Sequence, residues 1–171
     1  MLPLILVSTL ALAGKWDDAP TDVEARTTLQ APAEKVHAAL ADLRSFAQLL
    51  PADCAKDWEF TATTKGVGSR ARVTYTYGPL KRTLTANVVG DEPGRLWRVD
   101  HEDEKKGFFI QVTYPTTPNP SVTSVVLSTP LNPPPWPLKP AFYKKVLPAW
   151  EGCYARTLQA LGERVAAPDA P

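Results

Sequence analysis

Apolar and polar residues alternate along most of the chain, with the period of two that is typical of strands with one buried face. In 23–30, for example, the odd positions are apolar or small and the even positions are charged or polar. Five further segments share this pattern, each followed by glycine, proline or a charged tip. They are 58–62, 71–77, 84–88, 97–101 and 108–114. A last strand is expected at 122–129, although that segment shows no clear inward face.

Two short helices are expected between the first strand and the second. Pro32 and Glu34 are favourable residues for a first helical turn, and the apolar positions that follow, up to Leu43, recur at helical spacing. A second helix around Phe46 ends at Pro51, because proline cannot continue a regular helix.

One long amphipathic helix is predicted near the C-terminus. Seven apolar residues recur at spacings of three or four, and the charged residues lie off this stripe. The helix has about 25 residues, which is ~38 Å at 1.5 Å per residue. Pro148 is expected to kink it near its first turns. The stripe consists of Tyr143, Leu147, Trp150, Tyr154, Leu158, Leu161 and Val165.

A cluster of prolines precedes this helix. Of the 18 prolines in the chain, six lie from Pro130 to Pro140, and we expect no strand or helix to run through them. The segment is interpreted as a stiff, extended connector between two elements. Recognition of the cluster by a proline-binding domain is the less favoured alternative.

The expected order is a strand, two short helices, six strands and one long helix, which indicates the α+β class. Six or seven antiparallel strands present one apolar face, and the C-terminal helix is the only expected element large enough to cover it. We therefore predict a curved antiparallel sheet wrapped on that helix. Such an arrangement often leaves an interior volume rather than a filled core.

Composition narrows the classes of function. A chain of 171 residues with 44% apolar and 22% charged residues is long enough for one domain with a real core, and too apolar for a disordered protein. A formal net charge of +1 gives no electrostatic basis for binding nucleic acid. Only two histidines and two cysteines are present, at no metal-ligand spacing, so no metal site is expected.

The N-terminal segment 1–13 contains no charged residue and ends in an Ala-Leu-Ala pattern, which resembles a short signal peptide cleaved after Ala13. No lysine or arginine precedes the apolar run, so an N-terminal helix of a cytoplasmic protein is the alternative. Export, with no membrane span after processing, is the favoured expectation. The organisation is then a signal peptide at 1–13, a linker at 14–21, one domain at 22–165 and a flexible tail at 166–171.

Cys54 and Cys153 are the two cysteines of the chain. In an exported protein they would form one disulfide that closes a long loop, whereas free thiols would act as small buried apolar residues. We expect the two residues to lie close together, with Cys153 beside Trp150 and Tyr154 on the long helix. A Cα–Cα separation above about 7 Å would exclude the bond.

Three local motifs carry a resemblance to a known superfamily. Ala31-Pro32-Ala33-Glu34-Lys35-Val36 follows the first strand, Gly66-Val67-Gly68-Ser69 forms a glycine turn, and Val88–Pro93 leads into Arg95-Leu96-Trp97. Over 22–165 the chain resembles the START-like (SRPBCC) superfamily, which includes the polyketide cyclase/dehydrase-like proteins. The resemblance implies a helix-grip fold, a cavity for a hydrophobic ligand between the sheet and the C-terminal helix, no cofactor and no universal catalytic triad.

Candidate ligand-binding residues share the inward phase of their elements. Tyrosines are prominent because they combine apolar area with one directional hydrogen bond, and ordinary core packing is their alternative role. Arg82 either anchors an acidic head group or lies outside its strand. His101 lies either at the cavity mouth or at the start of a charged hairpin tip, whereas His37 is expected at the surface. The full set is Phe60, Tyr75, Tyr77, Arg82, His101, Tyr114, Tyr143, Trp150 and Tyr154.

The leading hypothesis is a monomeric, non-catalytic protein that binds a hydrophobic or aromatic small molecule, or a lipid. The alternative is a cyclase- or dehydratase-type enzyme that positions a reactive chain in the same cavity. Such an enzyme needs two inward polar groups near one ligand position, and the pairs to inspect are His101 with Tyr114 and Arg82 with Tyr75. An interaction role for the proline-rich connector is a third option.

Overall fold

The structure is a computed structural model that describes residues 21–102, 107–132, 134–135 and 137–167. The expected signal peptide, 1–13, lies outside the described residues, as do most of the expected linker and tail. The elements in chain order are β1 (Thr21–Leu29), α1 (Ala33–Leu40), α2 (Leu43–Leu49), β2 (Ala55–Phe60), β3 (Arg70–Tyr77), β4 (Leu80–Glu92), β5 (Leu96–Glu102), β6 (Gly107–Thr113), β7 (Thr123–Leu131), α3 (Lys139–Ala141), the π-helical turn η1 (Phe142–Val146) and α4 (Leu147–Ala166).

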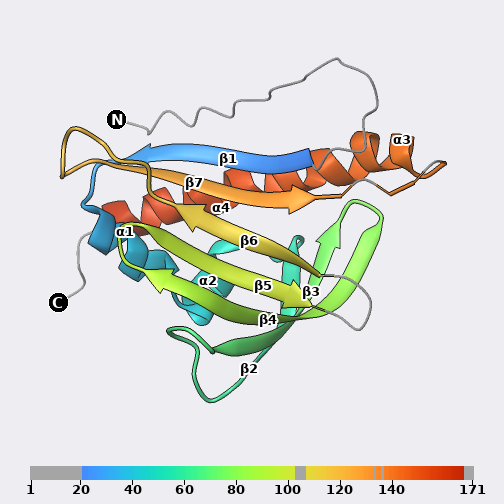
Figure 1. Cartoon of the computed structure of the whole chain (residues 1–171), viewed down its shortest axis with the longest axis horizontal. Helices are drawn as coiled ribbons and strands as arrows, with labels where there is room; N and C mark the ends of the chain where they lie inside the picture. The colour runs from blue at the N-terminus through green and yellow to red at the C-terminus, as the bar shows by residue number, and fades with distance from the viewer. Residues whose placement is uncertain (1–20, 103–106, 133, 136, 168–171) are drawn as a thin grey trace.

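The strands form one antiparallel sheet in the order β1-β7-β6-β5-β4-β3-β2. The sheet is curved, and α4 runs along it behind β7 in the view of Figure 1. The helix packs against β1 and β3 of the sheet and against both short helices. This arrangement confirms the α+β, helix-grip architecture expected from the order of elements. In the part of the chain that the structure describes, no helix has the length and apolar character needed to cross a membrane.

Strand β7 has a clear inward face, which the hydropathy pattern did not reveal. Its buried inward residues are Thr123, Val125, Leu127 and Thr129. Two of the four are threonines, so the apolar signal is diluted at both ends of the strand. Their hydroxyls are nevertheless satisfied inside the core, and that of Thr123 donates to the carbonyl oxygen of Ala31 at 2.6 Å.

The second short helix, α2, begins after Asp42, whose side chain caps its N-terminus. The carboxylate of Asp42 accepts the backbone N–H of Arg44 at 2.8 Å and the hydroxyl of Thr64 at 2.9 Å. The buried face of α2 then packs on the sheet, where the ring of Phe46 meets the edge of Trp97 with 5.0 Å between ring centroids. The two short helices therefore close the end of the sheet that α4 leaves uncovered.

The C-terminal helical segment begins irregularly. The turn η1 is π-helical, and regular α4 follows with Pro148 in its first turn. The expected kink is therefore a π-helical turn, because proline removes a backbone donor and displaces the hydrogen-bond pattern before it. The tip of the β3–β4 hairpin packs at this point: a Cβ on Gly78 would lie 2.6 Å from the carbonyl oxygen of Lys145, so only glycine fits.

The expectation that no strand or helix runs through the proline cluster was wrong at both of its ends. Pro130 lies in β7, opposite Asp22 of β1, and the pairing of β7 with β6 reaches only Ser128. Because the β6 ladder has already ended at Pro130, the missing N–H of this proline costs no hydrogen bond to β6. Pro140 lies in the first turn of α3, where the backbone N–H has no helical partner. Pro133 lies outside the described residues.

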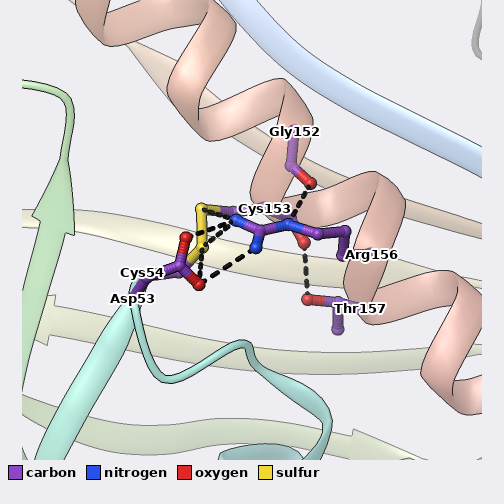
Figure 2. The surroundings of a disulfide bond; sticks show 6 residues. All are labelled: Asp53, Cys54, Gly152, Cys153, Arg156 and Thr157. Atoms are coloured by element: carbon purple, nitrogen blue, oxygen red, sulfur yellow. Dashed lines mark hydrogen bonds and ion pairs between the residues drawn. A yellow bond between two sulfur atoms is a disulfide. The ribbon is translucent and has the colours of Figure 1, made fainter.

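Cys54 and Cys153 form a disulfide with a Cα–Cα distance of 6.0 Å, as expected. The bond joins the chain just before β2 to the middle of α4, and both cysteines are buried. Figure 2 shows Arg156 reaching from α4 across the disulfide to Asp53. The guanidinium donates to both carboxylate oxygens, at 3.0 and 2.9 Å, and lies 3.0 Å from the Sγ of Cys54. These hydrogen bonds lower the pKa of the Asp53 carboxyl.

Reduction of the disulfide is expected to lower the free energy of unfolding by about 3–5 kcal/mol, because the bond closes a loop that spans most of the domain. Urea unfolding with and without dithiothreitol measures this difference. The double variant Cys54→Ala/Cys153→Ala is the matched control and should be insensitive to the reductant. Coincident curves for the oxidised and reduced protein would contradict a stabilising role.

Candidate ligand-binding site

Aromatic side chains from the sheet and from α4 meet between these two layers. Tyr75 lies at the centre, with ring contacts to Trp58, Tyr77, His101 and Phe108 at centroid distances of 5.2 to 6.3 Å. Aromatic contacts at such distances stabilise beyond the burial of area. We call the whole group the aromatic cluster; it consists of Trp58, Phe60, Tyr75, Tyr77, His101, Phe108, Trp150 and Tyr154.

Local backbone geometry explains why these side chains converge. Tyr75 and Tyr77 are two residues apart on β3, so both face inward, and each is at least 96% buried. Trp150 and Tyr154 are four residues apart on α4 and share one helical face. In β2 an irregularity at Asp57, which has a φ of 57°, brings Trp58 rather than the aspartate to the inward position.

The Tyr77–Trp150 stack joins the β3–β4 hairpin to the start of α4. The two rings are nearly parallel, at an interplanar angle of 20°, with 3.6 Å between centroids. The stack lies one residue from Gly78, whose backbone packs on the π-helical turn η1. Trp150 also meets the ring of Phe108 edge-on at 4.9 Å. This end of the cluster is therefore assembled from a hairpin tip and an irregular helical turn.

His101 is completely buried inside the cluster, and it is also one of the residues around a depression at the end of β5 and β6. Its Nδ1 is 3.2 Å from the carbonyl oxygen of Val99, so Nδ1 carries the proton and donates to it. The other nitrogen, Nε2, then accepts the hydroxyl of Tyr75 at 2.8 Å. Burial lowers the pKa of His101 to about 3 and raises the pKa of Tyr75 well above its usual value. Both groups are therefore neutral at physiological pH.

The remaining polar atoms of the cluster divide into satisfied and unsatisfied ones. The hydroxyls of Tyr154 and Thr129 hydrogen-bond to each other, and both side chains are fully buried. The hydroxyl of Tyr77 and the Nε1 of Trp58 are buried and have no hydrogen-bond partner among the described residues. A buried polar atom without a partner costs about 1–3 kcal/mol, so these two donors would gain stability from a partner.

Tyr114 and His37 are placed differently from the sequence expectations. His37 is buried, not at the surface: its Nδ1 lies 3.1 Å from the Tyr114 hydroxyl and its Nε2 lies 2.7 Å from Oδ1 of Asp91. Tyr114 therefore pairs with His37 rather than with His101, and it lies outside the aromatic cluster. Helix α1 packs against α4 and α2, and His37 is enclosed by partners from distant segments, Asp91 and Tyr114, which spacing in the sequence alone does not reveal.

Three other candidate ligand-binding residues remain, namely Arg82, Tyr143 and Phe60, and the structure shows what each one contacts. Arg82 is half-buried and lies opposite Tyr75 in the β3–β4 register, but the Tyr75 hydroxyl bonds His101 instead. Tyr143 is half-buried in η1 and meets the ring of Phe142 edge-on at 5.4 Å. Phe60 is in the cluster, where it stacks on Trp58 at 5.8 Å.

Trp58 and Phe108 are cluster members that the candidate set omitted. Both have the inward phase of their predicted strands, so the alternation pattern carried the signal that identifies them. The candidate set gave most weight to tyrosines and did not include these two rings. A ligand pocket is lined mostly by apolar and aromatic side chains, which makes these two residues equally relevant.

A surface depression of about 180 Å³ reaches the cluster from the end of β5 and β6. Pockets for drug-sized ligands usually measure about 300–1,000 Å³, so the depression alone is too small to enclose such a ligand. In the described part of the chain, no group of three or more His, Cys, Asp or Glu side chains is placed to hold a metal ion. The depression is lined by Arg98, Asp100, His101, Glu102, Phe108 and Phe109.

The curved antiparallel sheet, the two short helices after β1 and the long helix packed on the sheet define a helix-grip protein. Several solved structures share this fold. TTHA0849 from Thermus thermophilus has a TM-score of 0.69 at 20% sequence identity, covering 88% of this chain and 100% of that one. The KanY protein has a TM-score of 0.68 at 18% identity, covering 86% and 99%. Major latex-like protein 151 from Panax ginseng has a TM-score of 0.61 at 10% identity, covering 87% and 99%.

The sequence itself identifies the family. Residues 20–166 match the family model described as polyketide cyclase / dehydrase and lipid transport, and the chain belongs to this family. The START-like resemblance inferred from the motifs at 31–36, 66–69 and 88–97 is thereby confirmed. Proteins of this family typically bind hydrophobic ligands. No curated protein matches the chain in sequence.

Acidification is expected to destabilise the fold through His101. Its pKa in the folded protein is about 3, whereas histidine in an unfolded chain titrates near 6.5. Between these two values the unfolded state binds a proton that the folded state does not, so the free energy of unfolding falls as the pH falls. The expected loss is roughly 1 kcal/mol per pH unit below about pH 6, and there is no contribution above pH ~7.

Urea unfolding of the wild type and of His101→Gln, measured from about pH 7 to about pH 4.5, isolates this contribution. The glutamine does not titrate, and its amide oxygen is able to accept the Tyr75 hydroxyl in place of Nε2. We expect a shallower pH dependence in the variant than in the wild type. Parallel pH profiles for the two proteins would show that His101 is not responsible.

Proposed function

We propose that this protein binds a hydrophobic or aromatic small molecule, or the apolar part of a lipid, between the sheet and α4. The observation that carries the proposal is the aromatic cluster, which concentrates eight ring-bearing side chains at the interface of the two layers. Ordinary cores in cytoplasmic and exported domains are built mainly from aliphatic residues, and aromatic-lined interiors with few polar groups are typical of ligand sites. The hydrophobic-ligand role of the family supports the same conclusion.

Binding requires the rings of the cluster to separate, because the depression at its edge is smaller than a drug-sized ligand. The Tyr77–Trp150 stack is the natural place for separation. Its two rings belong to a hairpin tip and to the first turn after η1, so they move apart without breaking a continuous strand or the middle of α4. A planar ligand inserted between the two rings replaces the Tyr77–Trp150 contact with two new contacts, one to each ring, and these offset the free energy needed to separate the rings.

We favour binding over catalysis as the role of the polar atoms in the cluster. An enzyme of the cyclase or dehydratase type needs a group that exchanges protons near neutral pH. The Tyr75–His101 pair is the best-formed polar pair in the cluster, but with a pKa of about 3 His101 is a weak base, and Tyr75 is held protonated. This pair is better suited to keeping the two side chains neutral and oriented.

We also propose that the domain works in an oxidising compartment after removal of 1–13. The Cys54–Cys153 disulfide supports this, because such bonds persist mainly in exported proteins. Expression of the full chain in its own host, followed by intact-mass measurement of the purified protein, should give a chain that begins at Gly14. A chain that retains 1–13 and carries reduced cysteines would contradict export.

Ligand binding is tested with fluorene, a planar hydrocarbon without polar groups, by equilibrium dialysis against the purified protein. We expect saturable binding with one molecule per chain. Trp150→Leu should weaken it about tenfold, because the leucine removes the stacking surface next to Tyr77. Native mass spectrometry of protein purified from its own host should in addition show a co-purified organic molecule.

Trp97→Leu is the matched control, since Trp97 is also a buried tryptophan but packs on Phe46 under α2 rather than in the cluster. This variant should bind fluorene as the wild type does. Thermal unfolding of both variants verifies that they fold. Equal loss of binding in the two variants, or no saturable binding by the wild type, would count against the proposed site.

A further inference from the structure

Two hydrogen-bond donors in the aromatic cluster have no acceptor. The hydroxyl of Tyr77 and the indole Nε1–H of Trp58 are both buried, and neither has a partner among the described residues. Tyr77 is 96% buried as a whole residue. An indole N–H only donates, and the hydroxyl of a buried tyrosine usually donates too. Burial raises the pKa of Tyr77 well above its usual value, which keeps its proton in place as a donor at any physiological pH.

Both donors belong to rings that flank Tyr75. The centroid of Trp58 lies 6.3 Å from that of Tyr75, edge-on, and the centroid of Tyr77 lies 5.5 Å from it, nearly parallel. The other polar atoms of the cluster are already used. Tyr75 donates to Nε2 of His101, and the hydroxyl of Tyr154 is bonded to Thr129. The cluster therefore offers a ligand two unused donors, on either side of its central ring.

We propose that Tyr77 and Trp58 make this site select planar aromatic molecules that carry a carbonyl oxygen over hydrocarbons of the same shape. The inference rests on the proposed function and names the class of ligand for the same site. A carbonyl oxygen accepts without requiring an acceptor in return, so it satisfies an unused donor inside the cluster. The rest of such a ligand is a flat apolar ring system, which is able to stack on the flat faces of Tyr77 and Trp150.

Other polar groups fit the cluster less well. A ligand hydroxyl or amine brings its own proton, and the acceptors Nε2 of His101 and Oγ1 of Thr129 are already engaged. A carboxylate would bring a full charge among eight side chains that are all neutral at physiological pH, and burying an unpaired charge is costly. An aromatic ketone or quinone matches both the flat apolar surfaces and the unused donors.

The test compares fluorene with 9-fluorenone, which have nearly the same planar shape and differ by a carbonyl in place of a methylene. Equilibrium dialysis measures both dissociation constants for the wild type, Tyr77→Phe and Trp58→Phe. We expect the wild type to bind 9-fluorenone about tenfold more tightly than fluorene, as one well-formed buried hydrogen bond predicts. In at least one of the two variants this preference should fall to about twofold or less, with fluorene binding retained.

Trp97→Phe provides the matched control. Trp97 also has a buried Nε1 without a partner among the described residues, but it lies four residues before His101 on β5, about 13 Å along the strand. Its removal should leave the ratio of the two dissociation constants unchanged. Retained fluorene binding in each variant shows that the site is still folded.

The outcomes separate this inference from the proposed function. Saturable fluorene binding with a carbonyl preference that Tyr77→Phe or Trp58→Phe abolishes supports both. Fluorene binding with no preference for 9-fluorenone, or with the same preference in every variant, overturns the inference and leaves the proposed function standing. Absence of binding of either compound to the wild type overturns both.

Discussion

The packing of α4 against the inner face of the sheet is the contact on which the rest of this structure depends. The helix buries Trp150, Tyr154, Leu158 and Leu161 along one stripe, and this stripe covers much of the inward face of the strands. Several specific links hold the helix in place along its length. They include the Cys54–Cys153 disulfide, the ion pair of Arg156 with Asp53, and the hydrogen bond between the hydroxyls of Tyr154 and Thr129. The position of the helix therefore determines both the core and the candidate binding site.

The two halves of the covered face differ in chemistry. Under the short helices the sheet packs against aliphatic residues and Phe46, and its buried histidine, His37, is satisfied on both ring nitrogens by Asp91 and Tyr114. Toward the start of α4 the interior is aromatic, and some of its donors are unused. Each region holds a buried indole N–H without a partner among the described residues, that of Trp97 in the first and that of Trp58 in the second, but only the second region gathers eight ring-bearing side chains around its unused donors. This concentration of aromatic surface is why we assign structural work to the first region and ligand binding to the second.

Much of the candidate site was predictable because strand alternation and helical spacing are local properties. Tyr75, Tyr77, Trp150 and Tyr154 have the inward phase of their elements, and all four are in the aromatic cluster. The errors arose where partners come from distant segments. His37 was expected at the surface because its spacing on α1 is ambiguous, and only the fold brings Asp91 and Tyr114 to its two nitrogens. The pairing of His101 with Tyr75 instead of Tyr114 has the same origin.

The sequence by itself determined the kinds and order of the elements and the inward residues of most strands, because hydrophobic periodicity and turn residues act over a few neighbouring positions. Only the tertiary structure decided which inward side chains bond to each other, how η1 accommodates Pro148, and which donors remain unused. Those outcomes depend on contacts between β2, β3, β5, β6 and α4, which are far apart in the chain. A hydrogen bond depends on angstrom-scale placement of two atoms, and that placement is a property of the assembled layers rather than of any one segment.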